Sequence, residues 1–271
     1  GEYTYACSDF KFKKGLVSAT KTSGHTLQIA DGLWLDKKFK AAMMKSIAQS
    51  ELDRKRFVYS DIGFILLQQV VEAVTGKTLD AYLVSEFYRP MGLEHTLFQP
   101  LNRYKKADIM PTAANDYLRR QDLCGYVHDE AAAFMGGVSG NAGLFSTAQE
   151  LGKIYQMILN EGELDGKRYL RPETCRIFTT EKSAVSHRGL GYDKPNLKDP
   201  KANACASSAP ASVYGHTGFT GTCAWVDPEN DLVYIFLSNR LCPDAWNGKL
   251  NSMKIRQAVQ EVIYQSLYTP E

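Results

Sequence analysis

Two short segments contain residue types that could perform acyl-transfer chemistry. Tyr59, Ser60 and Asp61 stand directly before an apolar helical pattern, and residues 215–222 open a strand with the sequence Gly-His-Thr-Gly-Phe-Thr-Gly-Thr. A phenol or an imidazole can move the proton of a nucleophile, and backbone N–H groups can stabilise an oxyanion. Taken alone, the first segment is also explained by helix capping and the second by close packing of a glycine-rich strand.

Hydrophobic periodicity predicts the helices that must position these residues. Apolar residues recur at helical spacing over residues 64–74, and Gly76 supplies a stop. Helices are also predicted over residues 37–50, over 79–88 ahead of a proline, and from the capping box at 147–150 onward. The Tyr59 segment is therefore expected at the N-terminus of a helix.

The second segment is expected to begin a meandering antiparallel sheet. Strand patterns cover residues 213–219, 222–226 and 232–237, and an amphipathic helix ends the chain. Helices first, then a sheet, predict an α+β fold rather than alternating βαβ units. We expect one domain over residues 1–271, with three parts: an irregular lead-in of short strand or loop (1–50), a mostly helical and loop part (55–212), and the sheet with the C-terminal helix (213–271).

The middle of the chain holds weaker candidates for chemistry. Residues 99–125 are expected to form loop and short helix, and residues 136–143 bring four glycines into tight turns. Ser139 lies there without the complete Gly-x-Ser-x-Gly elbow of a nucleophile. The neighbours His128, Asp129 and Glu130 could suggest a metal, but Asp129 is better explained as the cap of a following short helix.

Composition excludes several classes of partner and cofactor. The 32 Lys and Arg residues nearly balance the 30 Asp and Glu residues, so nothing indicates a nucleic acid or an anionic membrane. The six cysteines have no zinc-ligand spacing, so we expect no metal site, and disulfides remain open. The sequence contains neither a signal peptide nor a membrane-spanning run.

Read together and in order, the two segments resemble the second and third motifs of the class C β-lactamase and DD-peptidase superfamily of serine hydrolases. Residues 59–76 are similar to the Tyr-Ser-Asn-type motif, with Asp61 in place of the more usual asparagine. Residues 215–222 resemble the Lys-Thr-Gly motif, with His216 in place of lysine. The segment 136–146 resembles the glycine-rich linker of β-lactamase-related envelope hydrolases, with Asn141 where histidine is frequent. The resemblance covers about residues 55–268 and implies a β-lactamase/transpeptidase-like fold.

The resemblance implies roles for individual residues. Tyr59 would act as base or proton shuttle, with His216 supplying positive character or a hydrogen bond beside the phenol. Thr217 and Gly218 would shape the strand that holds the substrate, and the N–H of Phe219 would be one oxyanion donor. Asp61 would be an acceptor where the family's asparagine can also donate. No metal or organic cofactor is implied.

The nucleophile is the missing part of this pattern. The family's Ser-x-x-Lys turn has one formal match ahead of Tyr59, formed by Ser18 and Lys21, which stands only 41 residues before the tyrosine. Polar residues and a glycine follow Lys21 and disfavour the expected helix. We therefore expect the nucleophile helix and the N-terminal strands to lie upstream of residue 1, in a longer protein.

Two hypotheses follow. The first is a β-lactamase-like serine hydrolase domain that cleaves an amide or ester through an acyl-enzyme and is inactive as this fragment. The alternative is a non-catalytic domain that binds cell-wall ligands or packs on a partner enzyme. The resemblance implies a periplasmic or envelope location, a small-molecule or cell-wall peptide substrate, and a parent chain that could include a glycosidase domain. An exposed sheet edge predicts self-association.

Overall fold

The computed structural model describes residues 11–51 and 57–268, and they separate into two compact units. Unit 1 comprises residues 1–84, 97–145 and 241–245, and unit 2 comprises residues 85–96, 146–240 and 246–271. Cys7 lies outside the described residues, whereas the five described cysteines are free thiols. None of the described helices is long and apolar enough to cross a membrane.

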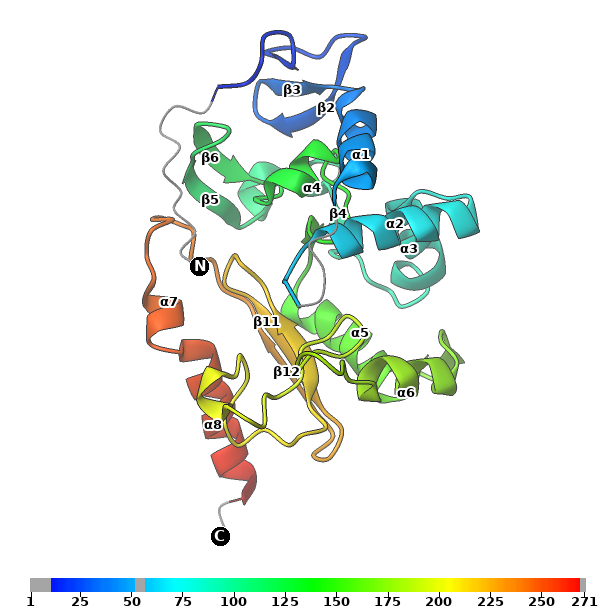
Figure 1. Cartoon of the computed structure of the whole chain (residues 1–271), viewed down its shortest axis with the longest axis vertical. Coiled ribbons are helices and arrows are strands. Elements are labelled where there is room, and N and C mark those ends of the chain that lie inside the picture. Colours follow the sequence, from blue (N-terminus) through cyan, green and yellow to red (C-terminus); the bar gives the residue numbers. More distant parts are fainter. Residues whose placement is uncertain (1–10, 52–56, 269–271) are drawn as a thin grey trace. The chain divides into compact units, whose positions relative to one another are not determined.

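Unit 1 combines a small antiparallel sheet in the order β1-β3-β2, a hairpin of β5 and β6, the short pair β4-β7, and the helices α1 to α4 (Figure 1). Its elements are β1 (Val17–Ser18), β2 (His25–Ala30), β3 (Leu33–Asp36), α1 (Phe39–Gln49), α2 (Ile62–Thr75), α3 (Leu79–Leu83), β4 (Leu97–Phe98), β5 (Pro111–Asp116), β6 (Gln121–Cys124), α4 (Glu130–Phe134) and β7 (Leu144–Phe145), with 3-10 turns at Pro100–Asn102 and Lys106–Asp108.

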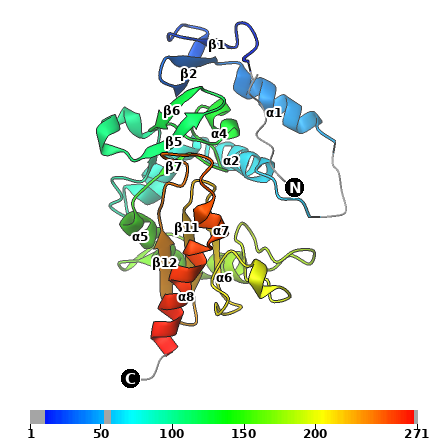
Figure 2. The same cartoon turned by 90° about the vertical axis from the view of Figure 1, so that its left-hand side faces the viewer.

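Unit 2 is built on the three-stranded antiparallel sheet β10-β11-β12. Figure 2 shows α8 running alongside this sheet. The elements of unit 2 are α5 (Ala148–Leu159), β8 (Glu163–Leu164), β9 (Lys167–Arg168), α6 (Pro172–Thr180), a 3-10 turn (Pro200–Ala202), β10 (Tyr214–Thr217), β11 (Cys223–Asp227), β12 (Leu232–Phe236), α7 (Lys249–Ser252) and α8 (Ile255–Tyr268). A π-helical turn (Val84–Tyr88) continues directly from α3.

The fold confirms the α+β prediction and most of the predicted helices. Gly76 ends α2 in the left-handed conformation, with φ of 66°. Asp129 caps α4, because its side chain accepts a hydrogen bond from the N–H of Ala132. At the start of α2, by contrast, the side chain of Asp61 makes no capping bond, and Ser60 Oγ accepts from the N–H of Ile62 at 3.2 Å.

Two sheets formed where the sequence predicted less order. A three-stranded sheet occupies residues 17–36, where we expected short strand or loop, and it packs with α4 around buried Ile29, Leu35 and Ala133. The β5–β6 hairpin replaces part of the loop and short helix expected over residues 99–125. It contains an ion pair of Asp116 and Arg119 whose two side chains are completely buried, with 2.9 Å between Oδ1 and Nε.

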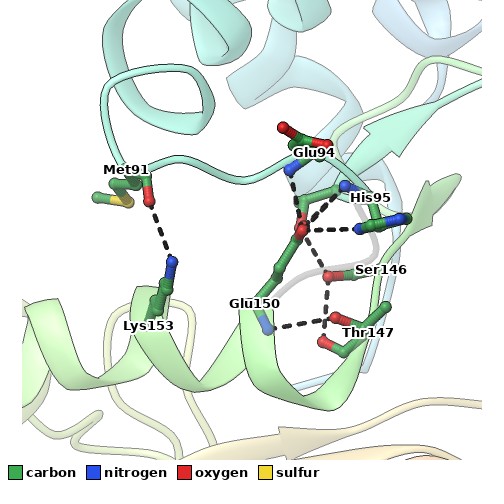
Figure 3. Close-up of polar contacts among 8 residues, drawn as sticks. Met91, Glu94, His95, Ser146, Thr147, Glu150 and Lys153 are labelled. Atoms are coloured by element: carbon green, nitrogen blue, oxygen red, sulfur yellow. Dashed lines mark hydrogen bonds and ion pairs between the residues drawn. The ribbon is translucent and has the colours of Figure 1, made fainter.

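A carboxylate anchors α5 of unit 2 to the segment that precedes it in this unit (Figure 3). Thr147 Oγ1 accepts from the N–H of Glu150, which is half of the predicted capping box. The other half is different: the Glu150 carboxylate accepts from the N–H groups of Glu94 and His95 and from the Thr96 hydroxyl, at 2.6 to 3.0 Å. Glu150 therefore holds residues 94–96 on the first turn of α5.

Candidate active site

His216 lies in β10, an edge strand of the unit 2 sheet, and is held at both ring nitrogens. Its Nδ1 is 2.7 Å from the carbonyl oxygen of Thr217, and its Nε2 is 3.0 Å from Nη1 of Arg188. A carbonyl can only accept and a guanidinium can only donate, so these partners require a proton on Nδ1 and a lone pair on Nε2. Arg188 is therefore the cation beside the imidazole, and Oδ2 of Asp193 lies 3.9 Å from the same Nε2.

A buried carboxylate fixes Arg188. Asp193 Oδ1 lies 3.0 Å from Nη2 of Arg188, and the Asp193 side chain is only 7% exposed. Asp193 is itself attached to β10, because it exchanges two backbone hydrogen bonds with Gly215 at 2.7 and 3.1 Å. His187 Nε2 lies 3.7 Å from the same carboxylate. The loop at 187–193 therefore brings a cation and an anion to the edge strand next to His216.

The neighbouring Lys194 has a structural role in this loop. Its ammonium donates to the carbonyl oxygens of Thr179 and Ser212 at 2.7 and 3.3 Å. Burial lowers the pKa of Lys194, with a smaller lowering from the charge of Lys182. Since its donors are directed at these backbone carbonyls, Lys194 links the loop to the end of α6 and to the segment before β10.

The residues after His216 form a tight turn between β10 and β11. Gly218 donates from its N–H to the carbonyl oxygen of Thr222 at 2.7 Å. A Cβ at Gly218 would lie 2.2 Å from Oγ1 of Thr222, so a larger residue there would require the Thr222 side chain to move. The ring of Phe219 is half exposed and lies under the guanidinium of Arg240, 4.4 Å from its Cζ. His216 and Thr217 thus end β10, and Gly218 and Phe219 follow them directly in the turn.

Tyr59 and Asp61 lie together in unit 1, at the N-terminus of α2. The side chain of Tyr59 is 50% exposed. The carbonyl oxygen of Asp61 accepts the first helical hydrogen bonds, from the N–H groups of Phe64 and Ile65 at 3.0 and 3.1 Å. Tyr59 and Asp61 belong to unit 1, whereas the His216 group belongs to unit 2.

The glycine-rich segment holds α2 in place within unit 1. A Cβ at Gly140 would lie 2.1 Å from the carbonyl oxygen of Phe64, so only glycine permits this approach to the helix backbone. The buried Gln68 donates to the carbonyl oxygen of Val138 at 3.2 Å. This contact explains the glycine at position 140 as a packing requirement.

Two of the weaker candidates, Ser139 and Asp129, form one structural network with Asn141 beside that contact. The Ser139 hydroxyl donates to Oδ1 of Asn141 at 2.7 Å, and Nδ2 of Asn141 donates to Oδ1 of Asp129 at 3.0 Å. A carboxamide has no lone pair that can take up the serine proton as a base would. Ser139 therefore lacks the activation that a nucleophile needs, and the network links the glycine-rich segment to the cap of α4.

Ser18 and Lys21 are not arranged as on a helical turn. Ser18 belongs to β1, where it pairs with Trp34, and its Oγ accepts from the N–H of Thr20 at 3.3 Å. Lys21 follows in a loop, with its ammonium 5.6 Å from the centre of the Trp34 ring.

Sequence reasoning missed Arg188 and Asp193, because both stand in a polar stretch that we expected to be loop. Their distance from His216 along the chain hides the relation, and only the backbone bridge between Asp193 and Gly215 brings them to the strand. The His187-Arg188 pair within that stretch was the available signal.

Comparison with known proteins identifies the family. The β-lactamase family model matches residues 19–256. The chain belongs to the β-lactamase family. A putative D-alanyl-D-alanine carboxypeptidase of Escherichia coli K12 is 38% identical over 197 residues, which cover 68% of this chain and 45% of that protein. A protein of the same description from Salmonella gallinarum is 32% identical over 227 residues, covering 78% and 52%. This β-lactamase-family chain thus spans about half the length of the curated relatives it matches.

Solved structures agree with this family at the level of fold. A β-lactamase of Mycobacterium bovis has a TM-score of 0.51 at 20% identity, covering 79% of this chain and 65% of the other. Simvastatin synthase of Aspergillus terreus has a TM-score of 0.53 at 15% identity, covering 85% and 61%. These likenesses confirm the β-lactamase/transpeptidase-like fold. The family model and the curated relatives support the serine hydrolase superfamily.

Proposed function

We propose that this chain is the substrate-binding part of a serine hydrolase that cleaves the terminal amide of peptides ending in D-alanyl-D-alanine. The observation that carries the proposal is the contact of Arg188 with His216, at 3.0 Å between Nη1 and Nε2. Asp193 holds Arg188, and His216 stands directly before Thr217 and Gly218 at the end of an edge strand. The curated relatives named as putative D-alanyl-D-alanine carboxypeptidases support the substrate class.

In this proposal the site binds a carboxylate as well as an amide. The guanidinium of Arg188 carries the positive charge, and its side chain is 20% exposed, so solvent or a ligand can reach it. A planar guanidinium with five donors suits a terminal carboxylate. Asp193 occupies the edge of β10 at Gly215, and the edge beyond Gly215 would offer backbone groups to an extended peptide, as in β-strand addition. A peptide with a free C-terminus would therefore bind better than its amide.

The proposed catalytic roles follow the two motifs. Tyr59 takes the proton of the nucleophile, as the resemblance implies. Within unit 2, Arg188 supplies a positive charge next to His216. Thr217 and Gly218 hold the substrate strand, and the N–H of Phe219 is one donor to the oxyanion. The carboxylate of Asp61 accepts a hydrogen bond from an N–H of the substrate.

We further propose that these 271 residues do not form an acyl-enzyme by themselves. Ser18 lies in a strand and Lys21 in a loop, so the lysine does not stand one helical turn from the serine. The same observation favours the second candidate function, a domain that binds cell-wall peptide without cleaving it.

Mass spectrometry of the intact protein tests whether these 271 residues form an acyl-enzyme. The protein is incubated with a fluorophosphonate and, separately, with benzylpenicillin, and any adduct is located by peptide mapping. We expect a folded sample with no stoichiometric adduct. An adduct on Ser18 would overturn the proposed inactivity and make Ser18 the nucleophile, with Ser18→Ala as the control that must abolish labelling.

The location and assembly are also proposals. Substrates of this kind place the protein at the cell envelope, in a parent chain that could include a glycosidase domain. Strand β12 is the other edge of the unit 2 sheet. Unpaired strand edges pair readily with a second copy, so we propose a homodimer formed through this edge.

A further inference from the structure

Unit 1 contains a cavity that the proposed function does not use. Its volume is about 230 Å³, and its wall includes residues of β2 and β3 and residues 125–127. All lining residues belong to unit 1. Pockets for drug-sized ligands have roughly 300–1,000 Å³, so this cavity suits a molecule of about monosaccharide size.

The cavity has one uncompensated positive charge. The ammonium of Lys21 lies over the Trp34 ring at its wall, and no described carboxylate lies within ion-pair distance of it. Lys106, the other ammonium nearby, lies over the Tyr126 ring but is paired with Asp31. A ligand with a single anionic group would therefore neutralise the charge of Lys21 in this cavity.

The polar side chains of the wall offer acceptors. The amide groups of Gln28 and Gln99 donate to the carbonyl oxygens of Ala30 and Gly136, and that of Asn102 donates to Oε1 of Gln99. Within the described part of the chain, the side-chain oxygens of Gln28 and Asn102 accept no hydrogen bond. These oxygens suit a ligand with several hydroxyl groups.

The remaining wall is aromatic and aliphatic. Trp34 and Tyr126 present rings to the cavity, and Leu27, Leu101 and Phe145 complete its apolar surface. The C–H face of a pyranose packs well on such rings, because it is flat and apolar while its hydroxyl groups point outward. A small hydrocarbon acid would leave the carboxamide oxygens without donors.

We propose that this cavity binds a hexose-sized sugar acid, with its carboxylate at Lys21, its ring on the aromatic side chains, and its hydroxyl groups at Gln28 and Asn102. Two kinds of molecule share this chemistry: a uronic acid, and an amino sugar that carries a lactyl ether. The inference stands on unit 1 alone and is independent of the proposed hydrolase activity.

The test compares matched acidic and neutral sugars on the whole chain. D-glucuronate is compared with D-glucose, and N-acetylmuramic acid with N-acetylglucosamine, by NMR of the tryptophan indole N–H signals and by calorimetry. We expect one acid to shift the Trp34 signal and to bind at least about tenfold more tightly than its neutral partner. The acid that binds identifies which of the two kinds of sugar the site takes.

Variants locate the binding. Lys21→Gln should weaken the acid about tenfold and leave the neutral sugar unchanged, whereas Lys13→Gln, which changes an exposed lysine of the same unit, should change neither. Both lysines are exposed, so these variants should fold. The proposal is overturned if none of the four sugars binds below about 10 mM, if acid and neutral sugar bind equally, if the Trp34 signal does not move, or if Lys21→Gln has no effect.

Discussion

The carboxylate of Glu150 should be one of the strongest single contributions to the stability of unit 2. Its oxygens accept from the N–H groups of Glu94 and His95 and from the hydroxyl of Thr96, and its side chain is 11% exposed (Figure 3). Hydrogen bonds to a charged group contribute about 1.5–3 kcal/mol each. Glu150→Gln keeps one acceptor oxygen and turns an NH₂ group toward N–H donors. We therefore expect the free energy of unfolding to fall by about 2–4 kcal/mol.

The effect of this substitution should depend on pH. Burial alone would raise the pKa of Glu150, but the hydrogen bonds from Thr96, His95 and Glu94 outweigh it and hold the pKa below its ordinary value of 4.5. A carboxylate with a lowered pKa in the folded state stabilises fully above the ordinary value and less as pH falls through the folded value. The difference between wild type and Glu150→Gln should therefore be largest near neutral pH and shrink below pH 4.5.

Urea unfolding at several pH values measures this, with the indole signal of buried Trp225 reporting on unit 2. Glu163→Gln is the matched control, because it removes the same charge from an ion pair with Arg168 in which both side chains are 44–45% exposed. Such exposed pairs contribute about 0–1 kcal/mol. The reasoning would be refuted if Glu150→Gln lowered the free energy of unfolding at neutral pH by no more than the control does. It would also be refuted if this loss of stability did not shrink in acid.

Three further predictions concern packing, a buried ion pair and assembly. In urea unfolding, Gly140→Ala should lower the free energy of unfolding by about 1–3 kcal/mol, because the new Cβ meets the Phe64 carbonyl oxygen. The control Gly152→Ala lies in open space within α5 and should raise the free energy of unfolding by about 0.5–1 kcal/mol. Equal effects of the two substitutions would refute the contact. Arg119→Met should lower the free energy of unfolding by about 3–5 kcal/mol, because it leaves Asp116 charged and buried. Adding Asp116→Asn should recover part of this loss, and no recovery would contradict the coupling of the two residues. Light scattering should give a dimer mass, and a monomer at working concentration would count against the strand-edge proposal.

Local signals predicted the parts of the fold that depend on local chemistry. The apolar spacing of residues 64–74 with Gly76 gave α2, and Thr147 gave the start of α5. Both rest on backbone geometry and hydrogen bonds within a few residues, which the sequence displays directly.

Other elements depend on partners far away in the chain. The turn between β2 and β3 carries an Asp31-Gly32 pair, a hairpin signal that could have revealed this sheet. The β5–β6 hairpin has no such signal: its turn places Arg120 at φ of 53° and relies on the buried Asp116–Arg119 pair. The bridge of Asp193 to Gly215 brings Arg188 to His216, and no local pattern encodes it.

The most direct test of the proposed function compares a peptide with its C-terminal amide. Diacetyl-L-lysyl-D-alanyl-D-alanine and the corresponding amide are titrated into the wild-type chain and into Arg188→Gln by calorimetry. The wild type should bind the free acid at least about tenfold more tightly than the amide, and Arg188→Gln should erase that difference. Equal binding of acid and amide by the wild type, or a preference that survives in Arg188→Gln, would contradict the assignment of this site.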